Sequence, residues 1–499
     1  MFTLRRVTMA LVGSTLLIAC GSGPGTTDPF AVLPSVPSTV WIAPTDLIPG
    51  TTAPNGAAVE IVPDDDVQAI VDANPPGTTY SFTPGVYREI QIVPKDGDVF
   101  VGTRGAILSG ARLLIDLKKN GDFWSEGGFD QEGERRGSCV GARPTCSSPE
   151  DVYFNDELLT QVGSADELQP GAWFFDYEND TVYLADDPSG NKVEIALVPY
   201  AFSGSASSVM IRGFVIEKYA NPAQRGAIGE KGTGPDWTVG ENEIRLNHGI
   251  GVKAGTRARI LGNYIHHNGQ LGVGGSGKGI LVEGNEIAYN NTGGFNPYWG
   301  GGGAKFVLTV GLVVADNYVH HNIGPGLWTD IDNIDTRYES NLVVANYHAG
   351  IKHEISYDAV IIDNVVEGNG FGNDNNVAGA GIFISSSPNV EVTGNVVKGN
   401  FDGIGGLARD RGDGLYGPYE LRNLYVHDNE IEMADGYTGI MSVRSKNRNA
   451  VFTEWGNRFE GNDYSIDGRG KHLWWLGKPR TFEEWTSFGL DTSGSMQRR

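Results

Sequence analysis

The chain has 499 residues and a formal net charge of −23, and its 71 glycines are about twice the usual share of roughly 7%. An acidic chain is repelled by nucleic acids and by anionic membranes, so its charge argues against either as the main partner. Frequent glycine and asparagine indicate many turns, and patterns of charge that favour helices are rare.

The first 57 residues are expected to serve export and tethering. Arg5 and Arg6 precede an apolar stretch at 7–19 that is too short to span a bilayer as a mature helix. The sequence LIAC at 17–20 resembles a bacterial lipobox, which implies removal of a signal peptide at 1–19 and lipidation of Cys20. A chance cysteine after an ordinary signal is the alternative. Residues 20–57, rich in Gly, Pro, Thr and Ser, read as a flexible linker, so we expect a protein lipid-anchored to the bacterial cell envelope that contacts the membrane only through its anchor.

Residues 58–115 are expected to begin the folded body. In PDDDVQAIVDANPPG, aspartates at 64–66 precede Val67, Ile70 and Val71, a pattern typical of a short N-capped amphipathic helix. A solenoid exposes an apolar end, and a helix placed here would cap it. The alternating segments that follow would supply the first coils.

Residues 116–198 break the pattern of the flanking segments. Asn155-Asp156 and Asn179-Asp180 lie between alternating runs, which predicts an inserted antiparallel β module. Cys139 and Cys146 lie close together in this segment. Because export leads to an oxidising compartment, we expect a disulfide between them; no histidine is nearby to complete a zinc site.

Residues 199–470 carry a short repeated phrase in which two asparagines are five residues apart. Its copies begin at asparagines 242, 263, 285, 317, 341, 364, 395 and 457, with a degenerate copy at 429. A basic spacing of about 22 residues with occasional inserts is typical of a solenoid. Because each unit holds short alternating runs and no helical period, the sequence predicts an all-β fold, a right-handed parallel β-helix. The asparagines are interpreted as structural, stacked from turn to turn.

Two further features have mainly structural interpretations. The doublets His266-His267 and His320-His321 lie inside the repeated phrase, and no third ligand follows from the spacing, so a metal site is the lesser alternative. Residues 471–499 are aromatic and acidic and are expected to form a C-terminal cap.

Two similar segments carry acids at matching positions, GLWTDID at 326–332 and GIKHEIS at 350–356. Successive side chains of a strand point to opposite faces. Strand alternation therefore predicts that one set of residues points into the coil, namely Leu327, Thr329, Ile331, Ile351, His353 and Ile355. The alternate set should point outward, namely Trp328, Asp330, Asp332, Lys352, Glu354 and Ser356.

In this register Asp330 and Glu354 are neighbours on adjacent strands, which lie about 4.8 Å apart. Two unpaired carboxylates so placed repel, and one tends to keep its proton. Retaining glycosidases use such a pair at about 5–5.5 Å, and Trp328 would offer a face for a sugar ring. Lys352 and Lys305 are candidate charge partners. The alternative is that acids and lysines only balance each other on an exposed sheet.

Inserts at 292–306, 370–381 and 400–420 flank this pair, and clustered inserts commonly build a cleft. Tyr298, Trp299, Arg409 and Arg411 are candidate substrate contacts. A calcium loop at DIDNID is disfavoured, because Ile334 occupies its fifth position and the later bidentate Glu is missing. We expect no metal and no cofactor.

The pattern resembles bacterial parallel β-helix glycoside hydrolases of the β-xylosidase type, in which a β-sandwich interrupts the helix. The resemblance covers 59 to about 470 and depends on PGTTYSFTPGVYREI, on VYFNDELLTQV with YLADDPSG, and on the GLWTDID…GIKHEIS pair. It implies Asp330 as nucleophile and Glu354 as acid/base on a carbohydrate substrate, with Asp332 as a reserve nucleophile. A lyase or epimerase acting on a uronate polymer, and a non-catalytic glycan-binding lipoprotein, remain open alternatives. The oligomeric state is not indicated.

Overall fold

The computed structural model describes residues 58–372, 378–467 and 470–498. The predicted signal peptide at 1–19, the lipidation site Cys20 and the linker at 20–57 lie outside these residues. Within them, no helix is both long and apolar enough to cross a membrane.

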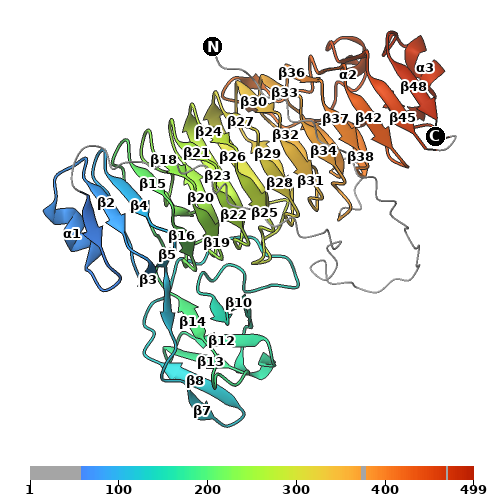
Figure 1. Cartoon of the computed structure of the whole chain (residues 1–499). Helices are drawn as coiled ribbons and strands as arrows, with labels where there is room; N and C mark the ends of the chain where they lie inside the picture. The colour runs from blue at the N-terminus through green and yellow to red at the C-terminus, as the bar shows by residue number, and fades with distance from the viewer. Residues whose placement is uncertain (1–57, 373–377, 468–469, 499) are drawn as a thin grey trace. The chain divides into compact units, whose positions relative to one another are not determined.

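Three long sheets form the body of the described chain, and each turn of the chain contributes a strand to each sheet in most coils (Figure 1). We call these sheets A, B and C and give their strands below. Neighbouring strands pair in parallel throughout sheets A and B, and in sheet C except for its last pair. Sheet A contains, in order, β1 (Val59–Ile61), β2 (Thr79–Phe82), β4 (Val99–Gly102), β15 (Met210–Arg212), β18 (Thr238–Gly240), β21 (Arg259–Leu261), β24 (Leu281–Glu283), β27 (Val313–Ala315), β30 (Thr336–Glu339), β33 (Ala359–Ile362), β36 (Val390–Thr393), β41 (Tyr425–His427) and β44 (Arg458–Glu460).

Sheet B contains β3 (Gly85–Arg88), β5 (Ala106–Ser109), β16 (Val215–Glu217), β19 (Glu243–Arg245), β22 (Tyr264–His266), β25 (Glu286–Ala288), β28 (Tyr318–His320), β31 (Leu342–Val344), β34 (Val365–Glu367), β37 (Val396–Lys398), β42 (Glu430–Met433), β45 (Asp463–Ile466) and β48 (Ser495–Arg498). Sheet C contains β17 (Gly226–Ile228), β20 (Ile250–Ala254), β23 (Leu271–Lys278), β26 (Gly302–Val310), β29 (Leu327–Asp330), β32 (Ile351–Glu354), β35 (Ala380–Ser385), β38 (Asp402–Arg409), β43 (Thr438–Arg444), β46 (Leu473–Trp475) and β47 (Lys478–Arg480).

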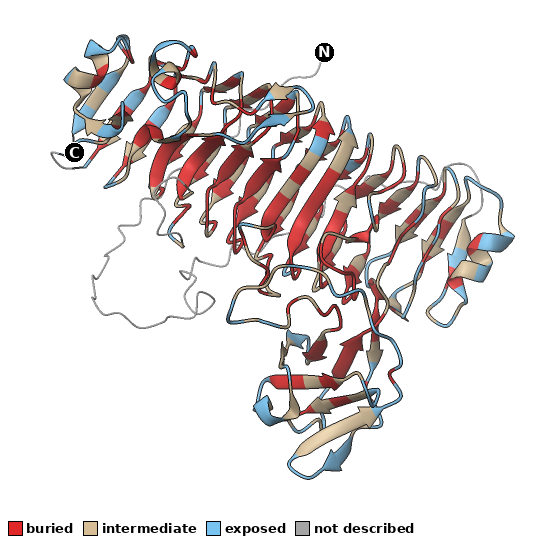
Figure 2. Ribbon diagram, turned by 180° about the vertical axis from the view of Figure 1, so that it is seen from behind, coloured by how far each residue is buried: buried red, intermediate tan, exposed pale blue. Residues whose placement is uncertain are grey.

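The core lies inside the coil, where the three sheets face one another. Ile265, Val319, Leu327, Ile351 and Val397 are fully buried members of one continuous apolar cluster. Buried residues run along strand after strand (Figure 2). Because every strand contributes inward aliphatic side chains at alternate positions, each coil covers the apolar surface of the next.

Stacked asparagines hold the corners of the coil together. The Asn290 side chain donates to the Asn322 side chain at 2.9 Å and to Ile265 O at 3.1 Å. Its oxygen accepts the backbone N–H of Asn268 at 3.1 Å. The predicted structural role is therefore confirmed: each amide satisfies backbone groups that no strand pairs. One ladder contains asparagines 242, 263, 285, 317, 341, 364, 395, 429 and 462, and the other 247, 268, 290, 322, 346, 369 and 400.

The copy of the phrase at 457–462 does not follow the others. It spans β44 in sheet A, and Asn462 rather than Asn457 continues the first ladder. A helix, α2 (Ala450–Thr453), precedes this strand. Asn457 accepts the N–H of Leu424 and donates to Val451 O within α2, so its side chain bonds different groups from those bonded by the ladder asparagines.

Strands β6 to β14 leave the coil and form two sheets of their own. One contains β10 (Glu157–Leu158), β9 (Val152–Phe154), β14 (Val193–Ala196) and β6 (Ala111–Leu113). The other contains β11 (Thr160–Gln161), β12 (Ala172–Asp176), β13 (Thr181–Leu184), β8 (Phe123–Gly127) and β7 (Lys118–Asn120), with the 3₁₀ helix η1 (Ala165–Glu167) nearby in sequence. The pairing is mainly antiparallel, around a separate apolar core that includes Trp173 and Val182. This module begins with β6, ahead of the boundary at 116 that the sequence suggests.

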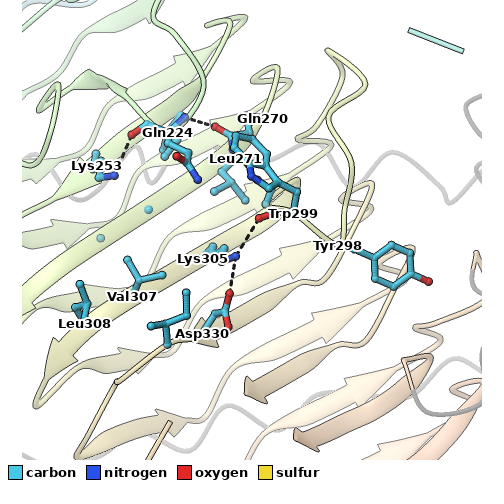
Figure 3. Close-up of a pocket in the computed structure, with 15 residues that line it drawn as sticks. Gln224, Lys253, Gln270, Leu271, Tyr298, Trp299, Lys305, Val307, Leu308 and Asp330 are labelled. Atoms are coloured by element: carbon cyan, nitrogen blue, oxygen red, sulfur yellow. Dashed lines mark hydrogen bonds and ion pairs between the residues drawn. The ribbon is translucent and has the colours of Figure 1, made fainter. Parts of the chain in front are cut away.

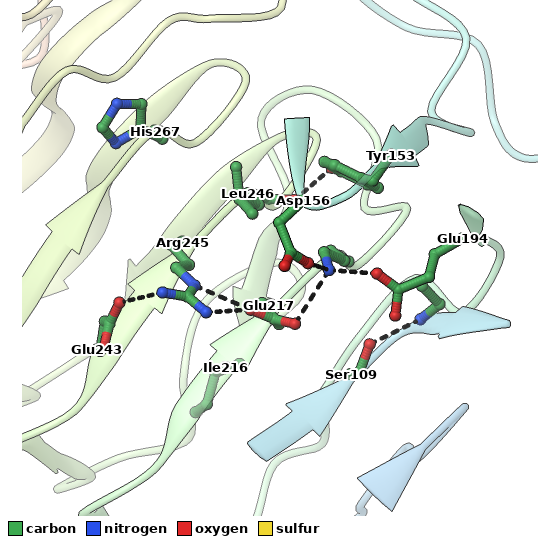
Figure 4. Close-up of polar contacts among 12 residues, drawn as sticks. Ser109, Tyr153, Asp156, Glu194, Ile216, Glu217, Glu243, Arg245, Leu246 and His267 are labelled. Atoms are coloured by element: carbon green, nitrogen blue, oxygen red, sulfur yellow. Dashed lines mark hydrogen bonds and ion pairs between the residues drawn. The ribbon is translucent and has the colours of Figure 1, made fainter. Parts of the chain in front are cut away.

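Buried ion pairs join this module to the coil (Figure 4). The fully buried Lys218, which follows β16, contacts Glu194 of the module at 2.5 Å and also Asp156. Glu217 lies 3.3 Å from the same ammonium group and pairs with Arg245 at 2.8 Å. Charges removed from water in this way require close partners, which here come from both parts of the chain.

Short helices lie near both ends of the described coil. The helix α1 (Val67–Ala73) has the predicted N-cap, in which the Asp66 carboxylate accepts the N–H of Ala69 at 3.1 Å, and Val67 and Val71 are buried. Near the other end, α3 (Phe482–Ser487) has a complete capping box between Thr481 and Glu484. Its buried Trp485 packs against Trp475 and Phe459 of the core, as expected for a cap.

Candidate active site

The two matching segments form neighbouring strands of sheet C. In β29 and β32 the register pairs Trp328 with Lys352 and Asp330 with Glu354. Leu327 is a fully buried core residue, and the Thr329 hydroxyl lies 2.7 Å from His353 Nδ1 inside the coil. Strand alternation therefore places the two carboxylates on the outer face as direct neighbours, as the sequence register predicts.

The predicted alternation fails beyond the ends of these strands. Ile331 has a φ of 61° and is 42% exposed, although it was expected to face the core. Ile355 has a φ of 36° and packs with Tyr357 and Tyr419 in a separate cluster. Ser356, expected outside, is fully buried and accepts from Asn333. Positive φ turns the chain at these corners, so the period of two ends with the strand.

Each carboxylate has a lysine of its own. Lys305 Nζ lies 2.8 Å from Asp330, and Lys352 Nζ lies 2.6 Å from Glu354. Trp328 lies between the lysines, whose Nζ atoms are 3.6 and 4.0 Å from its ring centroid. The ring is 2% exposed, so the expectation that Trp328 offers a stacking face to a sugar is wrong. It instead supports two ammonium groups through cation–π contacts.

These ion pairs decide the protonation of Glu354. Burial by itself raises the pKa of its carboxyl, but Lys352, Arg411 and Lys305 together lower that pKa below its ordinary value. Burial also lowers the pKa of Lys305, which Asp330 only partly offsets. The sequence predicted two unpaired carboxylates, one of which would keep its proton. That prediction is wrong, because the lysines relieve the repulsion on which it depended.

Two cavities flank the carboxylate pair. The larger, about 450 Å³, is lined by Asp330, Lys305 and Trp299 among others (Figure 3). The smaller, about 240 Å³, is lined by Glu354, Lys352, Phe383, Arg409 and Arg444 among others. Tyr298 lines both and is 53% exposed. The acids therefore lie at the junction of two concave surfaces, one acid in each.

The insert that carries Tyr298 and Trp299 is held in place from two sides. Trp299 O accepts from Lys305 Nζ at 3.0 Å. Cys139 and Cys146 form a disulfide, and Cys139 bridges to Phe295 of the insert. Cys146, Phe295 and Trp299 belong to one apolar cluster, so the disulfide loop supports a wall of the larger cavity.

The remaining predicted site residues, Arg409, Arg411 and Asp332, do not all line the cavities. Arg411 lies 3.5 Å from Glu354, and Arg409 lines the smaller cavity. Asp332, the reserve nucleophile, lies past the end of β29, where its Oδ1 accepts from Leu415 N at 2.9 Å and from the Tyr419 hydroxyl at 2.7 Å. These bonds attach the segment containing β39 (Asp413–Gly414) and β40 (Gly417–Pro418) to the coil, and we interpret Asp332 as the anchor of that segment. The glycine-rich inserts are only partly loops, since 302–306 and 402–409 are strand.

The sequence analysis did not identify some residues that line the cavities, although the strand register would have placed them there. Lys253 pairs with Gly274, which in turn pairs with Lys305, so all three lie in one outward column. The glycine between two lysines helps to line the larger cavity. Burial, with Arg225 and Arg136, lowers the pKa of Lys253 to about 8. On the other side, Arg444 pairs with Arg409.

Within 58–372, 378–467 and 470–498, no group of three or more His, Cys, Asp or Glu side chains is placed to hold a metal ion. The histidine doublets have other partners. His266 Nδ1 lies 2.7 Å from His267 Nδ1, and its Nε2 lies 3.3 Å from Glu243. His320 repeats the arrangement with His321 and Glu286.

Residues 226–375 match the family model of the "Right handed beta helix region". The fold is a right-handed parallel β-helix. XylC, in its complex structure with xylose, is similar to this β-helix with a TM-score of 0.65 and 14% identity, over 87% of this chain and 82% of that chain. The A-module of the Azotobacter vinelandii mannuronan C-5 epimerase AlgE6 is similar with a TM-score of 0.49 and 14% identity, over 86% of this chain and 93% of that module. A structure named as a glycoside hydrolase is similar with a TM-score of 0.45 and 10% identity, over 88% of this chain and 99% of that chain. No curated protein sequence matches the chain. At such identities the XylC likeness establishes the fold of this β-helix and leaves its chemistry open.

Proposed function

We propose that the protein is a retaining glycoside hydrolase that cleaves an oligosaccharide or polysaccharide lying across both cavities. The observation that carries the proposal is the direct pairing of Asp330 with Glu354 on the outer face of sheet C, each lining a different cavity. Adjacent strands provide the short separation of carboxylates that retaining chemistry requires. XylC, which is similar in fold, forms a complex with a sugar.

In this mechanism Asp330 attacks the anomeric carbon of a sugar in the larger cavity. The Lys305 ammonium, 2.8 Å away, orients the attacking carboxylate and is itself fixed by Trp299 O. Glu354 protonates the leaving oxygen on the side of the smaller cavity and later removes a proton from water. Lys352 and Arg411 favour the ionised form of Glu354 in the free protein. We propose that substrate groups entering the smaller cavity pair with these two cations before proton transfer, which favours the protonated form of Glu354.

A panel of neutral and acidic oligosaccharides tests the proposal. We expect new reducing ends from at least one substrate, and the first product to keep the anomeric configuration of the cleaved bond, as observed by NMR. Products that absorb in the ultraviolet would show elimination and replace the hydrolase by a lyase. Binding without any turnover across the panel would favour a glycan-binding protein.

We also propose that the enzyme is tethered to the cell envelope through Cys20. The proposal is based on the basic start, the short apolar stretch and LIAC at 17–20. Wild-type protein is expected in the membrane fraction of cells and Cys20→Ser in the soluble fraction. Equal partition of the two proteins would contradict lipidation at this residue.

A further inference from the structure

Two arginines lie side by side in the smaller cavity, and no acid within the described part of the chain pairs with them. Arg409 on β38 and Arg444 on β43 are direct partners in the parallel register, and both line the cavity. Among the described residues neither forms an ion pair, and the Arg409 Nε is buried with no hydrogen-bond partner. Like charges directly opposite each other in a sheet are unfavourable. An arrangement of this kind is stabilised when an anion occupies the space between the two guanidinium groups.

The acids described near the cavity do not supply that anion. Glu354 is already paired with Lys352 and Arg411. Asp410 accepts from the Ser445 hydroxyl and from the backbone N–H of Lys446. The lining of the cavity therefore has three cationic side chains, Lys352, Arg409 and Arg444, against the single carboxylate of Glu354. This local excess of positive charge occurs in a chain whose formal net charge is −23.

We propose that the smaller cavity is a subsite for a sugar unit that carries an anionic group, a carboxylate or a sulfate ester, bound between Arg409 and Arg444. Its assignment to the leaving-group side rests on the proposed role of Glu354 as the acid. Tyr298, which is 53% exposed, provides aromatic surface for the ring of that unit. At about 240 Å³ the cavity is smaller than a complete ligand site, as a subsite would be.

An anion here also affects the neighbouring acid. The pKa of Glu354 is lowered by Lys352 and Arg411 in the free protein. A bound anionic group adds negative charge near these cations, which favours the protonated form of Glu354. The charge of the substrate would thereby help to prepare the proton that the leaving oxygen receives.

Binding measurements test the subsite without requiring turnover. Glucuronic acid, glucose 6-sulfate and glucose serve as probes, titrated against the full-length protein by ligand-observed NMR. We expect an anionic probe to bind more tightly than glucose. Arg444→Gln and Arg409→Gln should each weaken that binding by about tenfold or more, as expected for charge-assisted hydrogen bonds, and leave glucose unaffected. Arg259→Gln, on the exposed face of sheet A, is the matched control and should change nothing.

Each outcome supports or overturns the proposal. Preference for glucuronic acid identifies a carboxylate subsite, and preference for the sulfate a sulfate-ester subsite. Equal binding of all three probes, unchanged in both variants, overturns it. Arg444 is exposed, so its variant remains informative if Arg409→Gln fails to fold. Anion binding that depends on both arginines in a protein that cleaves no saccharide would refute the hydrolase alone. Cleavage of neutral chains at rates that neither variant changes would refute the subsite alone.

Discussion

Asp330→Asn and Glu354→Gln are each expected to lower kcat by about a thousandfold or more on the substrate identified by reducing-end release. General acid–base groups contribute roughly 10²–10⁴-fold, and removing a nucleophile costs at least as much. Both substitutions keep the shape of the side chain, so the loss reports chemistry and not packing. Rates are to be measured under single-turnover conditions, together with melting curves that show whether each variant is folded.

The two variants should fail in different ways if their roles are as proposed. A leaving group of low pKa needs no proton, so Glu354→Gln should keep most of its first step on an aryl glycoside with a good leaving group. Asp330→Asn should fail on both kinds of substrate, because no covalent intermediate forms. Glu430→Gln, an exposed carboxylate on β42 in sheet B, is the matched control and should retain full activity. Undiminished rates in either site variant would reject the pair as the catalytic centre.

Asp330→Asn has a second consequence that must be separated from catalysis. Lys305 is largely buried, with 13% of its side chain exposed, and Asp330 is its carboxylate partner. In Asp330→Asn the ammonium group against Trp328 keeps neutral acceptors, the new amide oxygen and Trp299 O, but loses its negatively charged partner. The Lys352 side chain is as buried as that of Lys305, at 11% and 13% exposed, so we expect Glu354→Gln and Asp330→Asn to lose similar amounts of stability.

The sequence predicts the fold because its signals repeat. The Asn290 side chain satisfies two backbone groups of the preceding coil and donates to Asn322 of the next. The same task recurs from coil to coil, so a wrong interpretation of one copy is corrected by the others. The pairing of Asp330 with Glu354 follows from the same regularity. Features that occur once are harder to predict. Asn457 has the sequence of the phrase and a different position, because α2 shifts the chain ahead of it.

The environment of the site was less predictable than its register. An outward position does not imply exposure, since Lys305 and Lys352 cover Trp328 from both sides. Net charge also does not indicate the local charge of the smaller cavity, whose lining contains clustered cations although the chain as a whole is acidic. The burial of Trp328 and the clustering of cations both depend on side chains from neighbouring coils. Such side chains lie about 23 residues or more apart in the sequence, so a local sequence pattern does not bring them together. Only the register brings Arg409 beside Arg444.

Lys218→Met is expected to lower the free energy of unfolding by about 3–5 kcal/mol, the usual cost of removing one partner from a buried ion cluster. The change leaves Glu194 and Glu217, whose side chains are 1% and 7% exposed, without their shared ammonium group. Urea unfolding measures the loss. Hydrogen exchange in β9 and β14 should accelerate first, because these strands belong to the module that the cluster joins to the coil.

The dependence on pH distinguishes lost charge pairing from lost packing. Burial raises the pKa of Glu194, but Lys218 and Arg88 outweigh it, so the folded pKa lies below the ordinary value. Its contribution to stability is complete above the unfolded pKa of about 4.3 and disappears as the pH falls through the lower folded pKa. The difference in the free energy of unfolding between wild type and Lys218→Met should therefore be largest near neutral pH and smaller in acid, where Glu194 of the variant takes up a proton. A packing defect would give a gap that does not change with pH.

Lys192→Met is the matched control for this cluster. Lys192 contacts the same two module carboxylates, at 2.6 Å for Asp156 and 3.3 Å for Glu194, but its side chain is 39% exposed. Water replaces an exposed partner, so its loss should cost no more than about 1 kcal/mol. If both variants lose the same stability, burial is not what makes Lys218 important, and the module is held to the coil mainly by its other contacts, such as the bond from the Tyr153 hydroxyl to Leu246 O at 2.6 Å.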